Sequence, residues 1–216
     1  MEEIQQIFED EYIVVCIKPA GVQSEDGKQP GMPSLLSKNG EKLYVVHRLD
    51  KEVGGLMVFA KSKSVAASLS AQIQSGNFKK EYLSVVEGEI EESCRYEDLL
   101  FHDRNCNKTY VVNRERKGVK KAVLGFKRLS TVCHNGTHLS LVRIKLETGR
   151  THQIRVQFGS RKHPVFGDRK YGSKDIGCFA LFSCFISFIH PINNKNLEFE
   201  FRPLELYPWN LFENDM

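Results

Sequence analysis

The feature that most constrains the fold is a succession of short apolar segments, separated by turn residues, along most of the chain. Each segment has the length and the apolar or alternating pattern of a β-strand. The segments cover residues 12–19, 42–49, 54–61, 79–90, 108–115, 121–130, 138–147, 178–189 and 197–203. Because short turns rather than regular helices join most of them, the sequence predicts an α+β fold with a mainly antiparallel sheet.

Three segments are expected to be helical. The clearest follows Ser62, a favourable N-cap, and stops at Gly76. Its apolar residues recur at helical spacing at Val65, Ala66, Leu69 and Ile73. A short helix over residues 34–40 would be closed by Gly40, and another is expected to start at Thr151. In the last apolar segment, Glu198 and Glu200 alternate with phenylalanines, which predicts one wet face.

The bulk properties are those of an ordinary globular protein. The chain has 216 residues, of which 41% are hydrophobic and 27% charged, and it contains neither an internal repeat nor a linker-like tract. A single domain over residues 1–216 is therefore expected. The acidic start is unlike a signal peptide, and no apolar run has the length of a membrane span. The six cysteines form no CxxC pair and the histidines lack metal-ligand spacing, so reduced thiols, a cytoplasmic location and no metal are expected.

The charge distribution favours a polyanionic partner. The formal net charge is +4, and basic residues cluster in the runs FKKEY, NRERKGVKK, GSRKHP and GDRKYGSK. Each run by itself is typical of a solvated surface, but four in one small protein favour a nucleic-acid surface. Aromatic residues that could stack on bases lie close to these runs, at Phe78, Tyr82, Tyr110, Phe166 and Tyr171, and the alternative for each is a place in the core.

A charged loop in the stretch VVHRLDKEVGG raises a question about Asp50. It is surface decoration, half of a local ion pair with Arg48, or a catalyst. Surface decoration does not explain the two glycines that follow. Gly54 and Gly55 would allow another backbone or a ligand to approach closely. The ion pair is plausible because residues two apart in an extended chain point to the same side.

A second charged stretch, LETGRTHQIRVQ, offers possible partners for that loop. If this stretch is helical from Thr151, His152 and Arg155 share one face. Ile154 lies on the opposite face, and Phe158, one turn later, faces the core with it. Cations are disfavoured at a helix N-terminus, so such a start is easier to accept if it faces an anion. A phosphate or the Asp50 carboxylate would serve, and the alternative is an exposed basic helix.

Six motifs in order resemble those of the RluA-type pseudouridine synthases. HRLDKEVGGLMVFAKS resembles the signature loop of that family, and LETGRTHQIRVQ its third motif. The other four are EDEYIVVCIKPAGV, KKEYLSVVEG, HPVFGDRKYG and ISFIHP. Together they extend over roughly residues 8 to 203. The resemblance implies the pseudouridine synthase fold and an isomerase that converts uridine in rRNA or tRNA to pseudouridine.

The resemblance assigns the catalytic roles to Asp50, Tyr82 and Arg155. Asp50 would attack ribose C1′ or remove a ribose proton to give a glycal, and these two routes stay open. Arg155 would keep the carboxylate charged and oriented. The ring of Tyr82 would hold the detached base. The base leaves through N1 and rejoins the same ribose through C5, so the reaction needs no cofactor and no metal.

The resemblance also implies RNA as the partner and a set of substrate-binding residues. These are His47, Arg48, Leu49, Lys79, Lys80, Arg150, Thr151, His152 and Gln153. No small-molecule cofactor and no membrane are expected as partners. No S4-type RNA-binding domain is expected, because the sequence begins almost at the matching motifs. The oligomeric state is left open, with a monomer as the working expectation.

Four positions depart from the family pattern. Val53 and Gly54 stand where Thr-Ser is usual, and Gln157 and Phe182 stand where the family often has histidine. These departures motivate a rival hypothesis, a catalytically silent RNA-binding or RNA-folding protein of the same fold. A hydrolase that uses Asp50 as acid or base fits less well, because no motif places a second carboxylate beside it.

Overall fold

The computed structural model describes residues 4–37, 40–175, 177–203 and 206–215. The chain divides into two compact units, which are described separately. The first unit comprises Met1–Lys80 and Phe182–Pro203. The second comprises Glu81–Leu181 and Leu204–Met216. Among the described residues, none of the helices has the length and apolar character that crossing a membrane would require.

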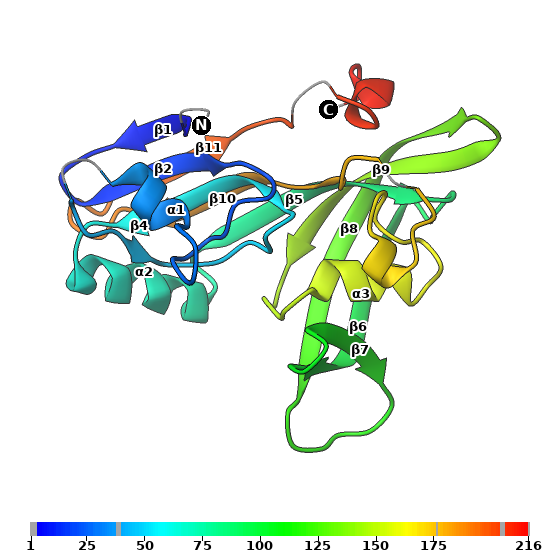
Figure 1. The fold of residues 1–216 in the computed structure, drawn as a ribbon, viewed down its shortest axis with the longest axis horizontal. Coiled ribbons are helices and arrows are strands. Elements are labelled where there is room, and N and C mark those ends of the chain that lie inside the picture. The colour runs from blue at the N-terminus through cyan, green and yellow to red at the C-terminus, as the bar shows by residue number, and fades with distance from the viewer. Residues whose placement is uncertain (1–3, 38–39, 176, 204–205, 216) are drawn as a thin grey trace. The chain divides into compact units, whose positions relative to one another are not determined.

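The first unit is built on a mixed sheet whose central strands are buried (Figure 1). Its strands are β1 (Gln6–Glu9), β2 (Ile13–Lys18), β3 (Tyr44–Val45), β4 (Gly54–Ala60), β10 (Leu181–Ile189) and β11 (Asn196–Glu200). They follow the order β1-β2-β4-β10, with β3 paired to β4 and β11 paired to β10. The β4–β10 pair is parallel, and the other pairs in this unit are antiparallel.

Helix α2 (Lys63–Ser75) covers one face of that sheet (Figure 1). Its boundaries confirm the prediction. The Ser62 side chain accepts a hydrogen bond from the Val65 amide, and Gly76 takes the left-handed conformation, with φ of 78°. Val65 and Leu69 enter a core with apolar residues of β2, β4 and β10. Burial of this one face, rather than helix propensity, holds α2 in place.

Helix α1 (Met32–Leu36) differs from its prediction. It starts earlier than residue 34 and has Ser37 as its C-cap, so Gly40 does not close it. Pro33 lies in its first turn, where a missing amide costs nothing. The predicted residues 38 and 39 lie outside the described ranges.

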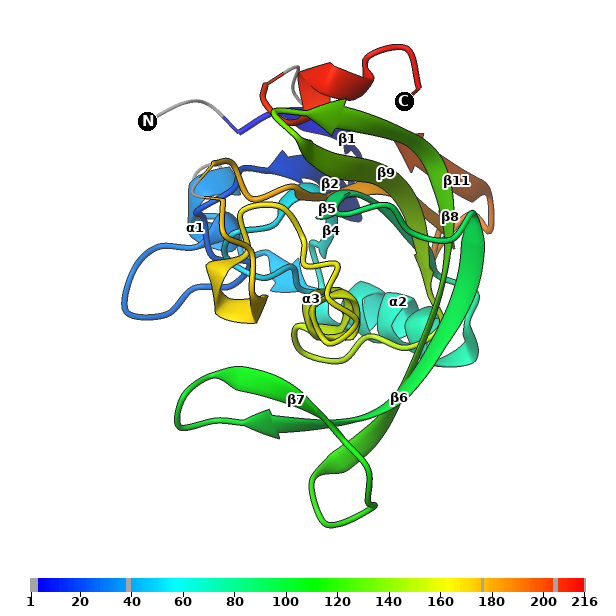
Figure 2. The same cartoon turned by 90° about the vertical axis from the view of Figure 1, so that its right-hand side faces the viewer.

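The second unit is an antiparallel sheet curved around a short helix (Figure 2). Its strands are β5 (Lys79–Glu87), β6 (Ser93–Asp103), β7 (Lys108–Val112), β8 (Val119–His134) and β9 (Thr137–Leu146), in the order β5-β9-β8-β6-β7. Helix α3 (Gln153–Gly159) lies within this curve, where Phe158 packs against Tyr96 and Phe126 with ring centroids 5.4 and 5.2 Å away. The described residues of the unit also form the 3₁₀ turns η1 (Arg169–Tyr171) and η2 (Trp209–Phe212).

The α+β class with a mainly antiparallel sheet is confirmed. The predicted wet face of β11 is confirmed too, because Glu198 and Glu200 are exposed while Phe199 is partly buried. Strand β6 was not predicted. Its first half is mostly polar and exposed, so it lacks the continuous apolar run of the other strands. It pairs with β7, which follows it after a turn, and with β8, which begins at Val119. Strand β3 is much shorter than the predicted residues 42–49.

Candidate functional site

Asp50 lies in a loop between two paired strands, as predicted. Strands β3 and β4 pair antiparallel, with Tyr44 opposite Ala60 and Val45 opposite Phe59. In the loop between them Leu49 is buried, Arg48 is exposed and Asp50 is half-buried. A half-buried carboxylate on a loop held by a sheet is accessible to a ligand and still fixed in place.

The backbone just before Asp50 is fixed by Ser24. The Ser24 hydroxyl donates to the Leu49 carbonyl at 2.7 Å and accepts from the Leu49 amide at 2.9 Å. Ser24 is 5% exposed, so both hydrogen bonds are shielded from water. One side chain therefore satisfies both polar backbone groups of the residue that precedes the carboxylate.

The backbone just after Asp50 is fixed by Lys18. Its Nζ donates to the carbonyls of Lys51, Pro19 and Val22 at 3.0, 2.9 and 2.7 Å. Lys18 is 0% exposed, and this burial lowers its pKa to about 8, although the nearby charges of Glu52 and Asp50 raise it. The Gly21 amide also donates to the Lys51 carbonyl, at 2.8 Å. The lysine of the Lys-Pro-x-Gly turn thus ties that turn to the Asp50 loop.

Gly55 brings β4 against the backbone of β10. Its φ is +119°, and a Cβ at this position would lie 2.3 Å from the Ser183 carbonyl oxygen. Only glycine tolerates both the conformation and the approach. The predicted close approach of another backbone is therefore confirmed, and the ring of Phe182 lies against the neighbouring Gly54.

The residues before Asp50 have other contacts than the sequence suggested. Arg48 forms an exposed ion pair with Glu25 at 2.8 Å, rather than with Asp50. His47 is buried, and its Nε2 accepts from the Val58 amide at 3.3 Å, while its Nδ1 has no partner among the described residues. Burial, together with the charge of Lys80, lowers the pKa of His47 well below its usual value. The imidazole is therefore neutral at physiological pH.

In the second unit, Arg155 forms a buried bidentate ion pair with Asp168. Its Nε lies 2.7 Å from Oδ2 and its Nη2 lies 2.9 Å from Oδ1. The two residues are 5% and 1% exposed. The guanidinium also lies 5.2 Å from the ring centroid of Tyr171 and 5.0 Å from that of Phe179. Such a setting fixes both the charge and the plane of the guanidinium.

Asp168 was missed at the sequence level. Its position in HPVFGDRKYG, which resembles a family motif, could have singled it out. The neighbouring residues do not predict the direction of its carboxylate. Asp50 belongs to the first unit and Arg155 to the second, so the pairing expected between them stays a prediction.

The segment that carries Arg155 departs from the predicted helix. Helix α3 begins at Gln153 rather than Thr151, and His152 precedes it in the left-handed conformation with φ of 53°. Residues from His152 to Phe158 are all buried, so the alternative of an exposed basic helix is wrong. Tertiary packing on both sides of the helix overrides the amphipathic interpretation.

The other residues expected to bind substrate in this segment have mixed environments. Gln153 is engaged internally, because its Oε1 accepts from the Arg150 amide and the Thr148 hydroxyl and its Nε2 donates to a backbone carbonyl. Arg150 and Thr151 are exposed. The Nδ1 of His152 lies 2.9 Å from the Tyr171 hydroxyl. Exposed charge at Arg150 therefore remains accessible to a ligand, and the Gln153 side chain supports the local backbone.

Strand β5 carries the remaining predicted residues. Tyr82 is buried opposite Ile144 of β9. Lys79 is exposed, and Lys80 is half-buried with its pKa lowered by desolvation. Of the other aromatics considered for stacking, Phe78 and Phe166 are buried at 6% and 1% exposure, like Tyr82 at 6%, so all three have the burial of core aromatics. Tyr110 and Tyr171 retain exposed surface.

Among the described residues, no group of three or more His, Cys, Asp or Glu side chains is placed to hold a metal ion.

At one of the departures from the family pattern, the Gln157 Nε2 donates to Asp98 at 2.7 Å. Arg161 holds the same carboxylate. Gln157 is thus part of an internal polar cluster of the second unit.

Comparisons with known proteins agree with the fold and the motifs. A family described as RNA pseudouridylate synthase matches residues 12–160. The dual-specificity RNA pseudouridine synthase RluA of Vibrio vulnificus is 35% identical over 212 residues, covering 94% of this chain and 84% of that protein. The uncharacterized RNA pseudouridine synthase YhcT of Bacillus subtilis is 34% identical over 205 residues, covering 89% of this chain. The chain spans only 66% of the length of YhcT.

Among solved structures, human RNA pseudouridylate synthase domain containing 1 has the same fold. Its TM-score is 0.81 at 21% identity, and the match covers 96% of this chain and 86% of that one. The family match extends over more than half of the sequence and includes Asp50, Tyr82 and Arg155. The chain therefore belongs to the RluA-type family of RNA pseudouridine synthases.

Proposed function

We propose that the chain is an RNA pseudouridine synthase that isomerises a specific uridine in rRNA or tRNA, with Asp50 as nucleophile or base. The observation that carries the proposal is the family match over residues 12–160, which includes all three expected catalytic positions. In the reaction the N1–C1′ bond of uridine breaks and a C5–C1′ bond forms. The C5 proton leaves and N1 ends protonated, so the atoms balance without a co-reactant.

The anchoring of the Asp50 loop supports this role. Ser24 and Lys18 hold the backbone on either side of Asp50 through buried hydrogen bonds. A group that attacks C1′, or removes a ribose proton, must be positioned before the substrate arrives. An acidic residue that merely decorates the surface would not need both flanks fixed. Either chemical route is compatible with such a loop.

Arg155 and Tyr82 are assigned supporting roles. Arg155, oriented by Asp168, would favour the ionised form of Asp50 and stabilise negative charge during the reaction. Tyr82 would present its ring to the detached uracil, so that the base turns without leaving the site. The target uridine has to leave its stack to reach Asp50, which costs a few kcal/mol and least in a loop or a single strand.

The test is isomerisation by the purified protein. Unmodified rRNA and tRNA transcripts that carry tritium at C5 of uridine should release tritium with wild-type protein and not with Asp50→Asn, although both bind the RNA. Glu92→Gln is the control, because it makes the same carboxylate-to-amide change at an exposed site. Wild-type turnover by Asp50→Asn would overturn the role of Asp50. Mapping pseudouridines with and without the gene identifies the RNA and the site.

The second candidate is a non-catalytic RNA-binding protein of the same fold. The ring of Phe182 against Gly54, close to the Asp50 loop and at a position where the family often has histidine, favours it. This candidate predicts RNA binding by wild-type protein, no tritium release from any transcript, and no pseudouridine lost when the gene is deleted.

A further inference from the structure

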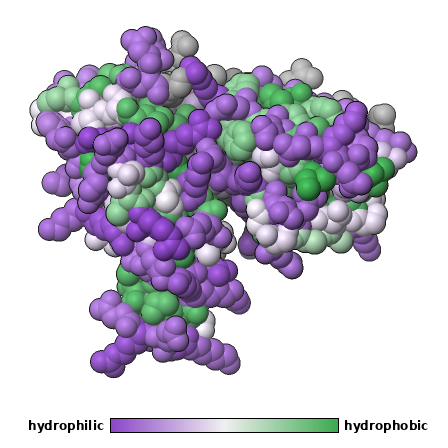
Figure 3. All heavy atoms as spheres, turned by 180° about the vertical axis from the view of Figure 1, so that it is seen from behind, coloured by the Kyte–Doolittle hydropathy of each residue, from purple (hydrophilic) through white to green (hydrophobic). Residues whose placement is uncertain are grey.

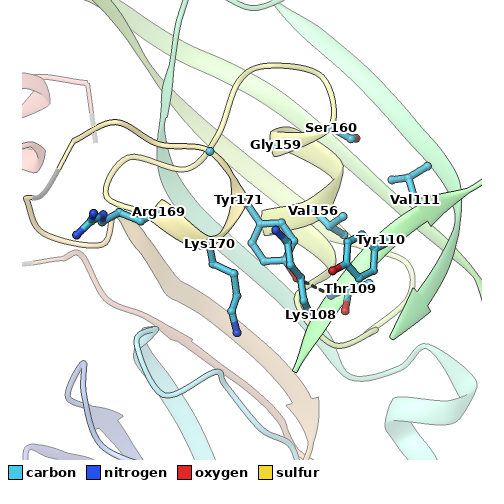
Figure 4. A pocket seen from close by; sticks show the side chains of 11 residues that line it. Lys108, Thr109, Tyr110, Val111, Val156, Gly159, Ser160, Arg169, Lys170 and Tyr171 are labelled. Atoms are coloured by element: carbon cyan, nitrogen blue, oxygen red, sulfur yellow. Dashed lines mark hydrogen bonds between the residues drawn. The ribbon is translucent and has the colours of Figure 1, made fainter. Parts of the chain in front are cut away.

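A hollow in the second unit is lined by none of the three residues to which the resemblance assigns catalysis. It has a volume of about 510 Å³ and lies between β7, the end of α3 and η1 (Figure 4). Its lining residues are Lys108, Thr109, Tyr110, Val111, Val156, Gly159, Ser160, Arg169, Lys170, Tyr171 and Gly172. This set contains two tyrosines and three cations but no Asp or Glu, so the hollow is suited to an anion that also has an aromatic part.

Lys108 lies against both tyrosines of the hollow. The Nζ of Lys108 is 5.7 Å from the ring centroid of Tyr110 and 5.6 Å from that of Tyr171. The Nζ of Lys170 donates to the carbonyl of Asn107 at 2.8 Å, which leaves two of its three donors for a ligand. The side chain of Arg169 points away from this group (Figure 4).

Tyr110 is the most unusual of these residues. It is 42% exposed and lies on β7, the last strand in the order of its sheet. Its hydroxyl lies 3.8 Å from the Cys106 thiol, and that hydrogen bond raises the pKa of Tyr110, so the ring is neutral at physiological pH. An exposed ring beside cations on a sheet edge is typical of surfaces on which unpaired bases stack.

No carboxylate competes for the two ammonium groups within the described part of the chain. Asp103 lies opposite Lys108 across the β6–β7 pair, but its carboxylate accepts from the Asn105 amide at 2.9 Å. Neither Lys108 nor Lys170 forms an ion pair with a described residue. Seen from behind, the β6–β7 projection has mainly hydrophilic side chains around a small hydrophobic area (Figure 3). The charge pattern thus favours a phosphate backbone.

The hollow is also joined to the segment that precedes Arg155. The Tyr171 hydroxyl accepts from the Thr109 amide at 2.8 Å and can donate to Nδ1 of His152. The Thr109 hydroxyl donates to the Thr151 carbonyl at 2.9 Å. Because Tyr171 lines the hollow and also contacts the Arg155 guanidinium, the hollow is held rigidly to the Arg155–Asp168 pair.

We infer that this hollow binds an unpaired nucleotide of the substrate RNA other than the target uridine. The base stacks on the exposed face of Tyr110, and Lys108 and Lys170 contact the phosphates that flank it. This inference rests on the proposed function, because it takes the substrate to be RNA. It adds a second contact that would favour RNAs with an unpaired residue besides the target uridine.

Fluorescence anisotropy with a labelled single-stranded RNA of mixed sequence tests the inference. Tyr110→Leu should weaken binding roughly 5- to 150-fold, the range for loss of one base stack, while Tyr110→Phe keeps the ring and the affinity. Lys108→Gln/Lys170→Gln should reduce the salt slope of log K by about 1.4, since each phosphate contact on a single strand contributes about 0.7. Ultraviolet crosslinking of a thiouridine-labelled RNA should map to residues 108–112.

The matched control is Lys63→Gln/Lys127→Gln, which removes the same charge at exposed positions outside the hollow. An equal effect of the two double variants would overturn the inference, because net charge would then explain it. Unchanged RNA binding by the hollow variants, with loss of binding to a phosphoserine peptide, would assign the hollow to a protein partner instead.

Tritium release separates this inference from the proposed function. If wild-type protein isomerises uridine and Tyr110→Leu has an unaltered KM, the hollow inference fails and the function stands. If wild-type protein does not isomerise uridine, the proposed function fails, and the anisotropy and crosslinking experiments still decide whether the hollow binds RNA.

Discussion

The carboxylate of Asp168 accepts two hydrogen bonds from the guanidinium of Arg155, at 2.7 and 2.9 Å, in a setting where both side chains are almost fully buried. Removal of one partner from such a pair leaves a desolvated charge without its main counter-charge, so the pair has consequences for stability as well as for the orientation of Arg155. The Asp50 loop, in the other unit, is fixed by the neutral Ser24 hydroxyl and by the buried ammonium of Lys18, which both bind its backbone.

Asp168→Asn should lower the free energy of unfolding by about 3 kcal/mol, because it breaks a buried pair from one side. Urea denaturation measures the change. Glu25→Gln is the control, since it breaks the exposed ion pair with Arg48 and should cost less than about 1 kcal/mol. Equal effects of the two substitutions would contradict the assignment of Asp168 as the buried partner that holds Arg155.

The lowered pKa of Lys18 should make the free energy of unfolding rise with pH above pH 8. Burial lowers its pKa to about 8 in the folded protein, against about 10.4 in an unfolded chain. Between these values the unfolded state binds more protons, so the contribution of Lys18 to stability rises with pH. The difference in unfolding free energy, wild type minus Lys18→Met, should increase by about 2 kcal/mol from pH 8 to pH 10. A constant or decreasing difference in unfolding free energy would show that burial does not lower the pKa of Lys18.

Ser24→Ala should reduce kcat for tritium release while RNA affinity is kept. The substitution leaves the Leu49 amide and carbonyl without their partner and loosens the backbone before Asp50. Ser62→Ala is a matched control, because it removes another serine hydroxyl, the N-cap of α2, at a cost of about 1 kcal/mol in stability. Should both variants lose stability but retain kcat, Ser24 would be structural only.

Gly55→Ala should destabilise the protein severely or prevent folding. A Cβ there would lie 2.3 Å from the Ser183 carbonyl oxygen, in addition to the strained φ of +119°. Gly76→Ala separates the two effects, because Gly76 also has positive φ but has nothing within 4 Å of a Cβ. We expect about 1 kcal/mol for Gly76→Ala and more than about 3 kcal/mol for Gly55→Ala by urea denaturation. Similar losses would show that the approach of β10 is relaxed easily.

Local signals predicted those elements whose ends are set by nearby residues. Ser62 and Gly76 define α2 because an N-cap and a left-handed glycine act within one turn of the helix. The same reasoning failed at two boundaries. Helix α1 ends before Gly40, with Ser37 as its C-cap. Helix α3 begins at Gln153 rather than Thr151, because His152 takes a left-handed conformation. Before α3, the Thr151 carbonyl accepts from the Thr109 hydroxyl and His152 contacts the Tyr171 hydroxyl, and these contacts with distant segments are absent from the local pattern.

The sequence by itself determined the α+β class, the main strands, the loop position of Asp50 and the family, because hydrophobic periodicity and motif order are properties of neighbouring residues. Only the tertiary structure decided that Lys18 is a buried anchor of the Asp50 loop, that Arg155 pairs with Asp168, and that Tyr110 and Tyr171 meet at Lys108. The contacts of Lys18 with Lys51, of Arg155 with Asp168 and of Lys108 with Tyr171 join segments that lie apart in the sequence. Their free energy depends on burial, distance and orientation, which arise only when the sheet has formed.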